Sequence, residues 1–301
     1  MPTLPSLPPL KHRLACRVLE LTQKLSMVGA WRWAGVMTKL LYPFNSDLKR
    51  TIQNNIAKTL PDQNQPQLAK QCFRHTLAFG LEAGSVWMKP LEYAANSITK
   101  IHGLALLQQA QASGKGVLIL LPHLGNWEMA NQFIAPRAKV VALYKPHQNQ
   151  QLEHYIYTAR CRAGVSMVPT NRRGVAQILR HLKSGGVTVI LPDQVPESQG
   201  SSVLVPFFGH AAHTATLVPK LAKSSGAVLL GLVCARDEQG AFEVHISSAP
   251  STIADNDLTL AATAMNSYIE SLVRQFPAQY QWSYKRFKTI PGGTNESNHN
   301  I

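Results

Sequence analysis

His123 and Glu128 are separated by four residues in a segment that directly follows an apolar run at 117–121. The run is typical of a buried β-strand, and Asn126 is a favourable N-cap for a helix that begins at Trp127. In open α/β sheets, ligands bind beyond the carboxyl ends of the strands. His123 therefore lies where a catalytic side chain is expected.

The spacing between His123 and Glu128 restricts how the two side chains can meet. On one regular helix they would point about 140° apart, so contact requires His123 in the turn and Glu128 in the first helical turn. There the positive helix end favours an ionised Glu128, which can orient the imidazole and stabilise its protonated form. No serine or cysteine lies nearby in a nucleophile-elbow pattern, so the pair predicts a general base that activates a bound hydroxyl.

Two simpler interpretations of this segment stay open. The spacing of a single histidine and a single glutamate can arise by chance, and a histidine at a strand end can simply cap a carbonyl group. A metal site is not indicated, because the segment lacks the HExxH pattern that places two histidines on one helical face.

A basic region follows, with no acidic residue between Glu153 and Asp193. Arg172 and Arg173 precede a predicted helix, and guanidinium pairs beside a helix N-terminus suit a phosphate group. A solvated basic face is the alternative. Asp193 ends a second apolar strand, where it either holds one of the arginines of this basic region in place or caps the next turn.

Short β-rich runs alternate with helical stretches from about residue 100 onward. This alternation predicts an α/β fold with a mostly parallel central sheet flanked by helices. The predicted strands are 117–121, 140–143, 165–169, 187–191, 228–233 and 242–246, and the predicted helices are 127–133, 152–162, 174–183, 215–224 and 258–276, with a further helix at 67–88 before them. The aromatic pair Phe207 and Phe208 is expected either to pack in the core or to line an apolar tunnel.

Composition limits the class of protein. Of 301 residues 45% are hydrophobic and 15% are charged, which excludes a disordered acidic chain, a collagen and a disulfide miniprotein. Thirty basic residues against 16 acidic ones give a net charge of +14, so the expected partner is anionic, either nucleic acid or lipid. The four cysteines form no CxxC pair, which fits a reducing compartment and argues against a zinc site.

The N-terminal part of the chain is both basic and apolar. Leu14, Val18 and Leu21 recur at helical spacing, with arginine and lysine side chains beside them. The segment 25–42 has almost the length of a membrane span, but the central Arg32 disfavours insertion by about 2.5–3.5 kcal/mol. We expect an interfacial hairpin or anchor there, with an amphipathic helix packed on the protein body as the alternative.

Several motifs, in order along about residues 10–290, resemble the late lipid A biosynthesis acyltransferases of the lysophospholipid acyltransferase superfamily. His-Leu-Gly-Asn-Trp-Glu at 123–128 resembles the family's His-Phe-Gly-Asn-Trp-Glu block. The other motifs are Tyr144–Pro146, Asn171–Gly174, Leu191–Gln194, Pro206–Gly209 with Ala215 and Thr216, Gln279–Trp282 and Lys285–Lys288. The chain departs from the family at Tyr284, where histidine is usual, and at Lys285, where arginine is usual.

The resemblance implies a reaction. His123, oriented by Glu128, would take the proton from the 3-hydroxyl of an acyl chain on a lipid A precursor. The resulting oxygen would attack the thioester of an acyl-carrier-protein or acyl-CoA donor, and no metal or organic cofactor is expected.

The resemblance also implies a substrate site. Arg160, Arg172 and Arg173 would hold phosphate or sugar-acid groups, with Asp193 as their organiser. The predicted site also includes Asn126 and Gln194, which lie within the family motifs.

Three regions are expected: a membrane-associating helical segment at 1–45, an α/β acyltransferase domain at 46–290, and a disordered tail at 291–301. The cationic N-terminus would lie on the anionic cytoplasmic face of a Gram-negative inner membrane. The alternatives are an acyltransferase for another membrane glycolipid or lysophospholipid, a lipid-binding scaffold without activity, and a basic nucleic-acid-binding protein. The last lacks a helix-turn-helix signature, zinc spacing and an RNP-type strand.

Overall fold

The computed structural model describes residues 10–147, 149–196 and 199–288, so the predicted tail at 291–301 lies outside the described residues. A seven-stranded sheet in the order β1-β9-β8-β2-β5-β3-β4 forms the centre, and β6 and β7 form a separate hairpin. All neighbours in the large sheet are parallel except β8 and β9. The strands are β1 (Ile98–His102), β2 (Val117–Leu120), β3 (Val140–Tyr144), β4 (Ser166–Pro169), β5 (Val187–Ile190), β6 (Ser202–Phe207), β7 (His210–Ala215), β8 (Val228–Arg236) and β9 (Phe242–Ser248).

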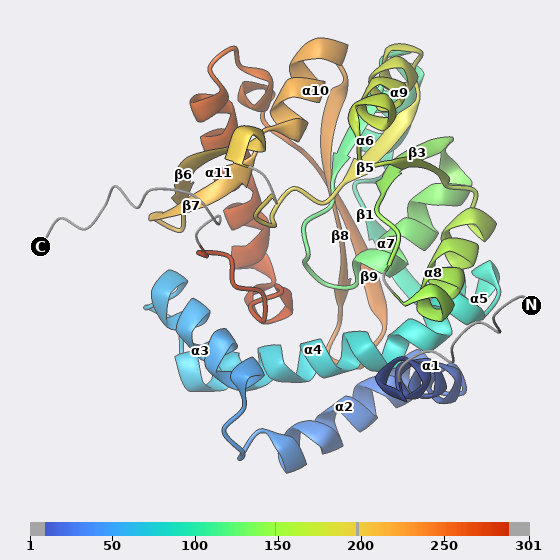
Figure 1. The fold of residues 1–301 in the computed structure, drawn as a ribbon, viewed down its shortest axis with the longest axis vertical. Helices are drawn as coiled ribbons and strands as arrows, with labels where there is room; N and C mark the ends of the chain where they lie inside the picture. The colour runs from blue at the N-terminus through green and yellow to red at the C-terminus, as the bar shows by residue number, and fades with distance from the viewer. Residues whose placement is uncertain (1–9, 148, 197–198, 289–301) are drawn as a thin grey trace, which may run out of the picture.

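Helices cover both faces of the sheet and one of its ends (Figure 1). The helices are α1 (Leu10–Thr22), α2 (Met27–Leu41), α3 (Asp47–Thr59), α4 (Gln65–Met88), α5 (Leu91–Asn96), α6 (Leu104–Ala112), α7 (Trp127–Ile134), α8 (Gln150–Arg162), α9 (Arg172–Lys183), α10 (Leu217–Ser225) and α11 (Leu258–Gln275). The predicted fold class, α/β with a mostly parallel sheet, is confirmed.

The central strand β2 shows why the sheet needs cover on both faces. All four of its residues are buried. Leu118 and Leu120 join a core with α9, α10 and α11, whereas Val117 and Ile119 join a second core with α6 and α7. Because side chains alternate along a strand, an all-apolar strand of this kind is stable only between two layers.

Helices α1 to α4 gather at one end of the sheet, with α4 packed against the other three (Figure 1). The segment around Arg32 forms one continuous helix, α2, rather than a hairpin, and one face of this helix packs on the protein body. Whether it also anchors the protein at a membrane stays a prediction. Ala30, Trp31 and Ala34 form its buried face toward α4. Within the described residues, none of the helices has both the length and the hydrophobicity needed to cross a bilayer.

The predicted strands and helices from residue 117 onward are all present, within a few residues of the expected bounds. β1, the hairpin of β6 and β7, and the helices α3, α5 and α6 were not predicted from the sequence. The hairpin turns at Phe208 and Gly209, whose φ angles are 49° and 74°. Two consecutive positive φ angles are what a tight hairpin turn requires, but phenylalanine is a rare choice for the first position. The sequence at Phe208 and Gly209 therefore did not indicate a hairpin turn.

The end of α1 approaches α4 so closely that only glycine fits between them. A Cβ at Gly84 would lie 2.3 Å from the carbonyl oxygen of Leu19. We predict that Gly84→Ala forces the two helices apart and lowers the free energy of unfolding by about 1–3 kcal/mol.

Gly80→Ala is the matched control on the same helix, because a Cβ there meets nothing within 4 Å. The control should be neutral or stabilising by up to about 1 kcal/mol. Urea denaturation measures both, and equal midpoints would contradict this account of the packing.

Candidate active site

His123 and Asp193 come together because the strands that carry them are paired in register. β2 and β5 are parallel neighbours, with Leu120 opposite Ile190. Each strand is followed by a leucine, a proline and then the functional residue, so His123 and Asp193 occupy equivalent positions beyond the same sheet edge. Parallel pairing thus brings a histidine and a carboxylate side by side.

Asp193 holds His123 by two hydrogen bonds. The Nδ1 atom of the imidazole lies 2.7 Å from Oδ1, and the backbone N–H of His123 donates to Oδ2 at 2.9 Å. The Asp193 side chain is 1% exposed and the His123 side chain 13%. One carboxylate therefore fixes both the backbone and the ring of the histidine, while the ring keeps access to solvent.

The electrostatics of this pair favour an ionised carboxylate. Burial alone would raise the pKa of Asp193, but the charge of a protonated His123 and the hydrogen bonds from its ring and backbone outweigh burial and lower the pKa. The adjacent Tyr280 is also buried, and burial together with the Asp193 charge raises the pKa of its hydroxyl well above the usual value. Tyr280 thus stays neutral beside the charged pair.

Ionised Asp193 can only accept hydrogen bonds, so the proton of a neutral His123 ring must lie on Nδ1. The other nitrogen, Nε2, then carries a free lone pair, and it has no hydrogen-bond partner among the described residues. The ring packs edge-on against Trp127, with centroids 4.9 Å apart, and Trp127 stacks on Phe79 at 4.0 Å. The arrangement is that of a general base held in one orientation against an apolar wall.

Glu128 does not contact His123, which corrects the predicted pairing. It lies in the first turn of α7 with its side chain 5% exposed, and its Oε1 atom accepts a hydrogen bond from Nη2 of Arg160 at 2.6 Å. Burial alone would lower the pKa of Arg160, but the charge of the Glu128 carboxylate and its hydrogen bond outweigh burial and raise the pKa of Arg160. The five-residue spacing allowed a contact with His123, but the helix directs Glu128 toward α8 instead.

Asp193 differs from its predicted role as organiser of the arginines, since its carboxylate is bonded to His123. Arg160 is bonded to Glu128, and its expected contact with a phosphate or sugar-acid group stays a prediction. Arg172 and Arg173 are exposed at the start of α9, with no side-chain partner among the described residues. Whether these two arginines hold a substrate stays a prediction.

Asn126 is buried and caps α7, as predicted, and its expected contact with substrate stays a prediction. Its Oδ1 accepts from the backbone N–H of Met129 at 3.0 Å, as an N-cap, and its Nδ2 donates to Glu82 of α4 at 2.7 Å. Gly125 makes the preceding turn possible, because a Cβ there would lie 2.1 Å from the carbonyl oxygen of Cys234. Gln194 donates to Gln281 at 3.1 Å and is only partly buried.

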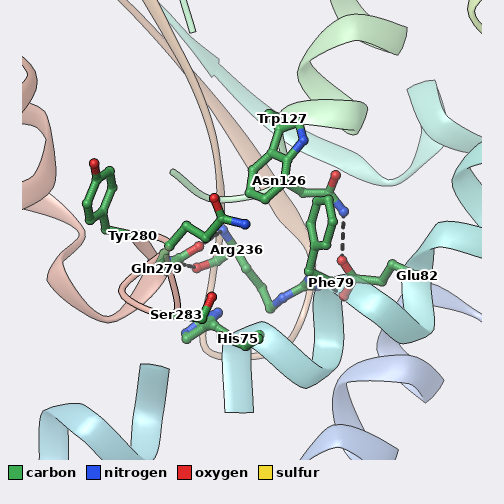
Figure 2. A pocket seen from close by; sticks show the side chains of 12 residues that line it. His75, Phe79, Glu82, Asn126, Trp127, Arg236, Gln279, Tyr280 and Ser283 are labelled. Carbon is green, nitrogen blue, oxygen red and sulfur yellow. Dashed lines mark hydrogen bonds and ion pairs between the residues drawn. The ribbon is translucent and has the colours of Figure 1, made fainter. Parts of the chain in front are cut away.

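A cavity of about 50 Å³ lies beside this turn, between α4 and the segment after α11 (Figure 2). Trp127 lines it and also touches His123, although His123 itself is not part of the lining. Glu82 pairs with Arg236 at its base. Burial, together with the charges of Arg236 and Arg74, lowers the pKa of the nearby His75 to about 3.

Phe207 and Phe208 do not line this cavity. They pack against Tyr280 and Trp282 in the core, which is the simpler of the two roles expected for them.

Asp193 was not predicted as the partner of His123, and the buried Glu82, Arg236 and Tyr280 were not predicted as site residues. The signal for Asp193 was present. The strand endings Leu121-Pro122-His123 and Leu191-Pro192-Asp193 repeat one pattern, and repeated endings on parallel strands indicate equivalent positions.

Comparison with known proteins identifies the chain. The bacterial lipid A biosynthesis acyltransferase family matches residues 21–289. The lipid A biosynthesis lauroyltransferase of Escherichia coli (strain K12) is 26% identical over 93% of this chain and 92% of its own length. A lipid A biosynthesis acyltransferase of Haemophilus influenzae is 30% identical over 64% of this chain and 59% of its own. A phosphatidylinositol mannoside acyltransferase of Mycobacterium tuberculosis is 28% identical over 48% of this chain and 47% of its own.

A poised imidazole at the carboxyl edge of a parallel sheet, in a chain whose relatives are acyltransferases, defines an acyltransferase. The chain belongs to the bacterial lipid A biosynthesis acyltransferase family, as the motifs around His123 indicated.

The lowered pKa of Asp193 leads to a pH-dependent prediction. The carboxylate's contribution to stability is complete above the pKa of an unfolded aspartate, about 3.9, and is lost as the pH falls through the lower folded-state pKa. Asp193→Asn should therefore be less stable than wild type at pH 7, by about 1–3 kcal/mol, with the difference shrinking below pH 4. Urea denaturation across this range measures it, with the exposed Asp62→Asn as control. A difference that is constant with pH would contradict the ionised pair.

Proposed function

We propose that the chain transfers a fatty acyl group from acyl-carrier-protein, or acyl-CoA, to the 3-hydroxyl of an acyl chain on a lipid A precursor, with His123 as the general base. The observation that carries this proposal is the 2.7 Å contact between His123 Nδ1 and the buried Asp193, which leaves Nε2 free to accept a proton. Membership of the lipid A acyltransferase family supports the substrate class.

In the proposed reaction, Nε2 of His123 takes the proton of the acceptor hydroxyl as its oxygen attacks the thioester carbonyl. The new ester C–O bond forms, the C–S bond breaks, and the imidazolium returns its proton to the departing sulfur. Asp193 stabilises the imidazolium between these steps. The residues described here account for both proton transfers.

Glu128 is proposed to act on the site through Arg160 rather than through His123. The carboxylate is nearly buried and holds the Arg160 guanidinium close to the Tyr144 ring, whose centroid is 5.5 Å away. Tyr144 in turn bonds Glu153. Loss of Glu128 would leave Arg160 without its partner and free to move, so Glu128 is a positioning residue in this proposal.

A double-mutant experiment separates the contribution of Asp193 to the rate of acyl transfer from that of Glu128. His123→Ala should lower kcat by about 10²–10⁴-fold, and Asp193→Asn should also lower it. In the His123→Ala background Asp193→Asn should have little further effect, because it acts only through the imidazole. Glu128→Gln should keep its effect in that background, because it acts through Arg160. The readout is the rate of acyl transfer, with circular dichroism to confirm folding.

The reverse pattern of coupling would return Glu128 to the role of dyad partner. Wild-type activity in His123→Ala would remove the general-base proposal altogether.

The acceptor is tested by incubating the enzyme with acyl-carrier-protein or CoA thioesters and lipid A precursors of different acylation states, read by mass spectrometry. Arg172 and Arg173 remain the proposed ligands of the acceptor's anionic groups, since they are exposed at the start of α9. The second candidate acceptor is another membrane glycolipid, which the phosphatidylinositol mannoside acyltransferase relative supports. Acylation of such a glycolipid, and not of lipid A precursors, would favour the second candidate.

We also propose that α1 and α2 dock the enzyme on the anionic cytoplasmic face of the inner membrane. Nine of the 13 large hydrophobic side chains that are exposed in the described part of the chain lie on α1, on α2 or, for Phe44, just after α2. This N-terminal apolar face consists of Leu14, Val18, Leu21, Val28, Trp33, Val36, Leu40, Leu41 and Phe44. The apolar stripe of α1 thus points outward, while Cys16 and Leu19 pack inward.

Cations accompany the N-terminal apolar face. A groove of about 420 Å³ between α2 and α4 is lined by Arg32, Lys39, Lys70 and Arg74, and none of its lining residues is acidic. Apolar side chains beside lysines and arginines are typical of a helix lying in the headgroup region of an anionic membrane. This juxtaposition also favours lipid over nucleic acid as the anionic partner.

Leu40→Glu should weaken binding to vesicles that contain anionic lipid, because it places a carboxylate on the apolar face. Leu260→Glu is the matched control, since Leu260 on α11 is 59% exposed and Leu40 is 64% exposed. Co-sedimentation with the vesicles measures both variants. Equal retention of the two would show that the membrane contact lies elsewhere.

A further inference from the structure

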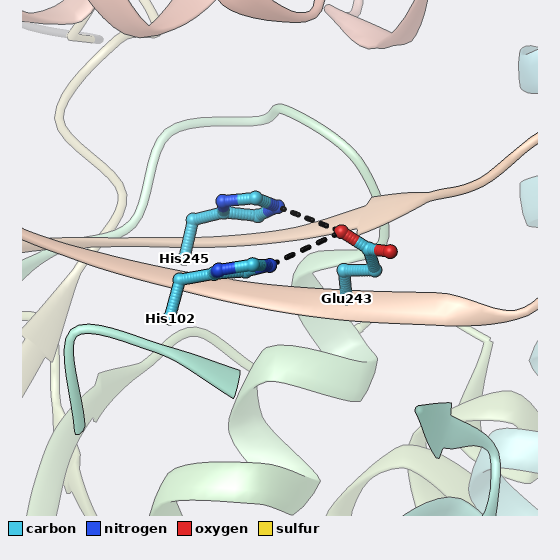
Figure 3. A group of neighbouring side chains, drawn as sticks. All are labelled: His102, Glu243 and His245. Atoms are coloured by element: carbon cyan, nitrogen blue, oxygen red, sulfur yellow. Dashed lines mark hydrogen bonds and ion pairs between the residues drawn. The ribbon is translucent and has the colours of Figure 1, made fainter. Parts of the chain in front are cut away.

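A second group of ionisable side chains lies outside the acyl-transfer site, where the edge strand β1 pairs with β9. His102 ends β1 and lies opposite His245 of β9, with Glu243 two residues before His245. The two rings are stacked, with centroids 4.5 Å apart and planes 15° apart. Figure 3 shows that both rings direct a nitrogen toward the same carboxylate.

The donor atoms are spaced as metal ligands are. Oε2 of Glu243 lies 3.2 Å from Nε2 of His102 and 3.8 Å from Nε2 of His245, and all three ligand atoms lie within 4.8 Å of one another. Around a tetrahedral Zn²⁺ with bonds of about 2.0–2.1 Å, neighbouring donors are about 3.3 Å apart. Small movements of the half-exposed His102 side chain and of the Glu243 carboxylate would bring the three atoms to that spacing.

One of the three donor atoms also lacks a partner that would satisfy it. Nε2 of His245 is buried and has no hydrogen-bond partner. A metal ion bound there would satisfy this nitrogen.

Lys100 occupies only one oxygen of the carboxylate. Its Nζ lies 2.8 Å from Oε1 of Glu243, which leaves Oε2 for a metal. A cavity of about 320 Å³ lined by Glu243 and His245 adjoins the group, so water can complete the coordination. The Phe276 ring packs 4.8 Å from the His245 ring and restricts its movement.

We propose that His102, Glu243 and His245 form a binding site for Zn²⁺ or a similar divalent transition ion, which joins the edge strand β1 to β9. The two-histidine, one-carboxylate donor set is one that zinc prefers, whereas Mg²⁺ and Ca²⁺ favour oxygen ligands. The site has no part in the proposed acyl-transfer reaction, which requires no metal.

The test uses the untagged full-length protein after treatment with a chelator. Calorimetric titration should show one Zn²⁺ bound per chain, and Co²⁺ should produce the visible absorption of a low-symmetry, nitrogen-ligated site. His245→Ala and Glu243→Gln should each weaken Zn²⁺ binding by more than about tenfold. His154→Ala is the control, because it removes an exposed histidine from α8, away from the group.

Lys100→Met is expected to change the affinity for Zn²⁺ in the opposite direction. It removes a competing cation and leaves all three ligands in place, so Zn²⁺ binding should become tighter. Circular dichroism confirms that each variant is folded. Absence of saturable Zn²⁺ binding in the folded wild type, or equal binding in His245→Ala and His154→Ala, would overturn the proposal.

Discussion

The in-register pairing of β2 with β5 is the constraint on which the active site depends. It brings the ends of two buried strands to one level, so that His123 and Asp193 meet without help from a flexible loop. A shift of one residue would turn all side chains of a strand to the opposite face. The apolar residues that fill both cores therefore also fix the distance between the His123 ring and the Asp193 carboxylate.

A buried network connects this sheet edge with α4. Glu82 bonds Arg236 at the end of β8 and Asn126 at the start of α7, so one carboxylate joins three elements. Burial raises the pKa of Glu82, while Arg236 and Asn126 oppose that shift. Removing one partner from a buried charge pair typically destabilises by about 3–5 kcal/mol. The turn that carries His123 is thus held both by the bond from Asn126 to Glu82 of α4 and by the bonds from His123 to Asp193.

Much of the fold was predictable from the sequence because its signals are local. Continuous apolar runs identified β2 and β5, and Asn126 identified the start of α7. The candidate base, His123, was predictable for the same reason. Its partner was not, because spacing along the chain ranks Glu128, five residues away, above Asp193, seventy residues away. Only the order and register of the strands reverse that ranking.

Surface features were predictable in kind but not in orientation. The stripe of Leu14, Val18 and Leu21 is visible in the sequence, and such stripes usually face a protein core. In this structure the small, partly polar opposite side of α1 packs on α4, where Gly84 permits close approach. The cluster at His102 was invisible because its members lie on two strands about 140 residues apart in sequence.

The outward stripe of α1 and α2 has a consequence for handling the protein. An exposed apolar surface in aqueous buffer tends to become buried, either in detergent or against another copy of the protein. Such self-association would hide the stripe while leaving the catalytic edge of the sheet intact. We therefore expect preparations without lipid or detergent to form larger particles of folded protein. Adding a detergent should reduce the particle size, because the contacts between copies are not those of a fixed subunit interface.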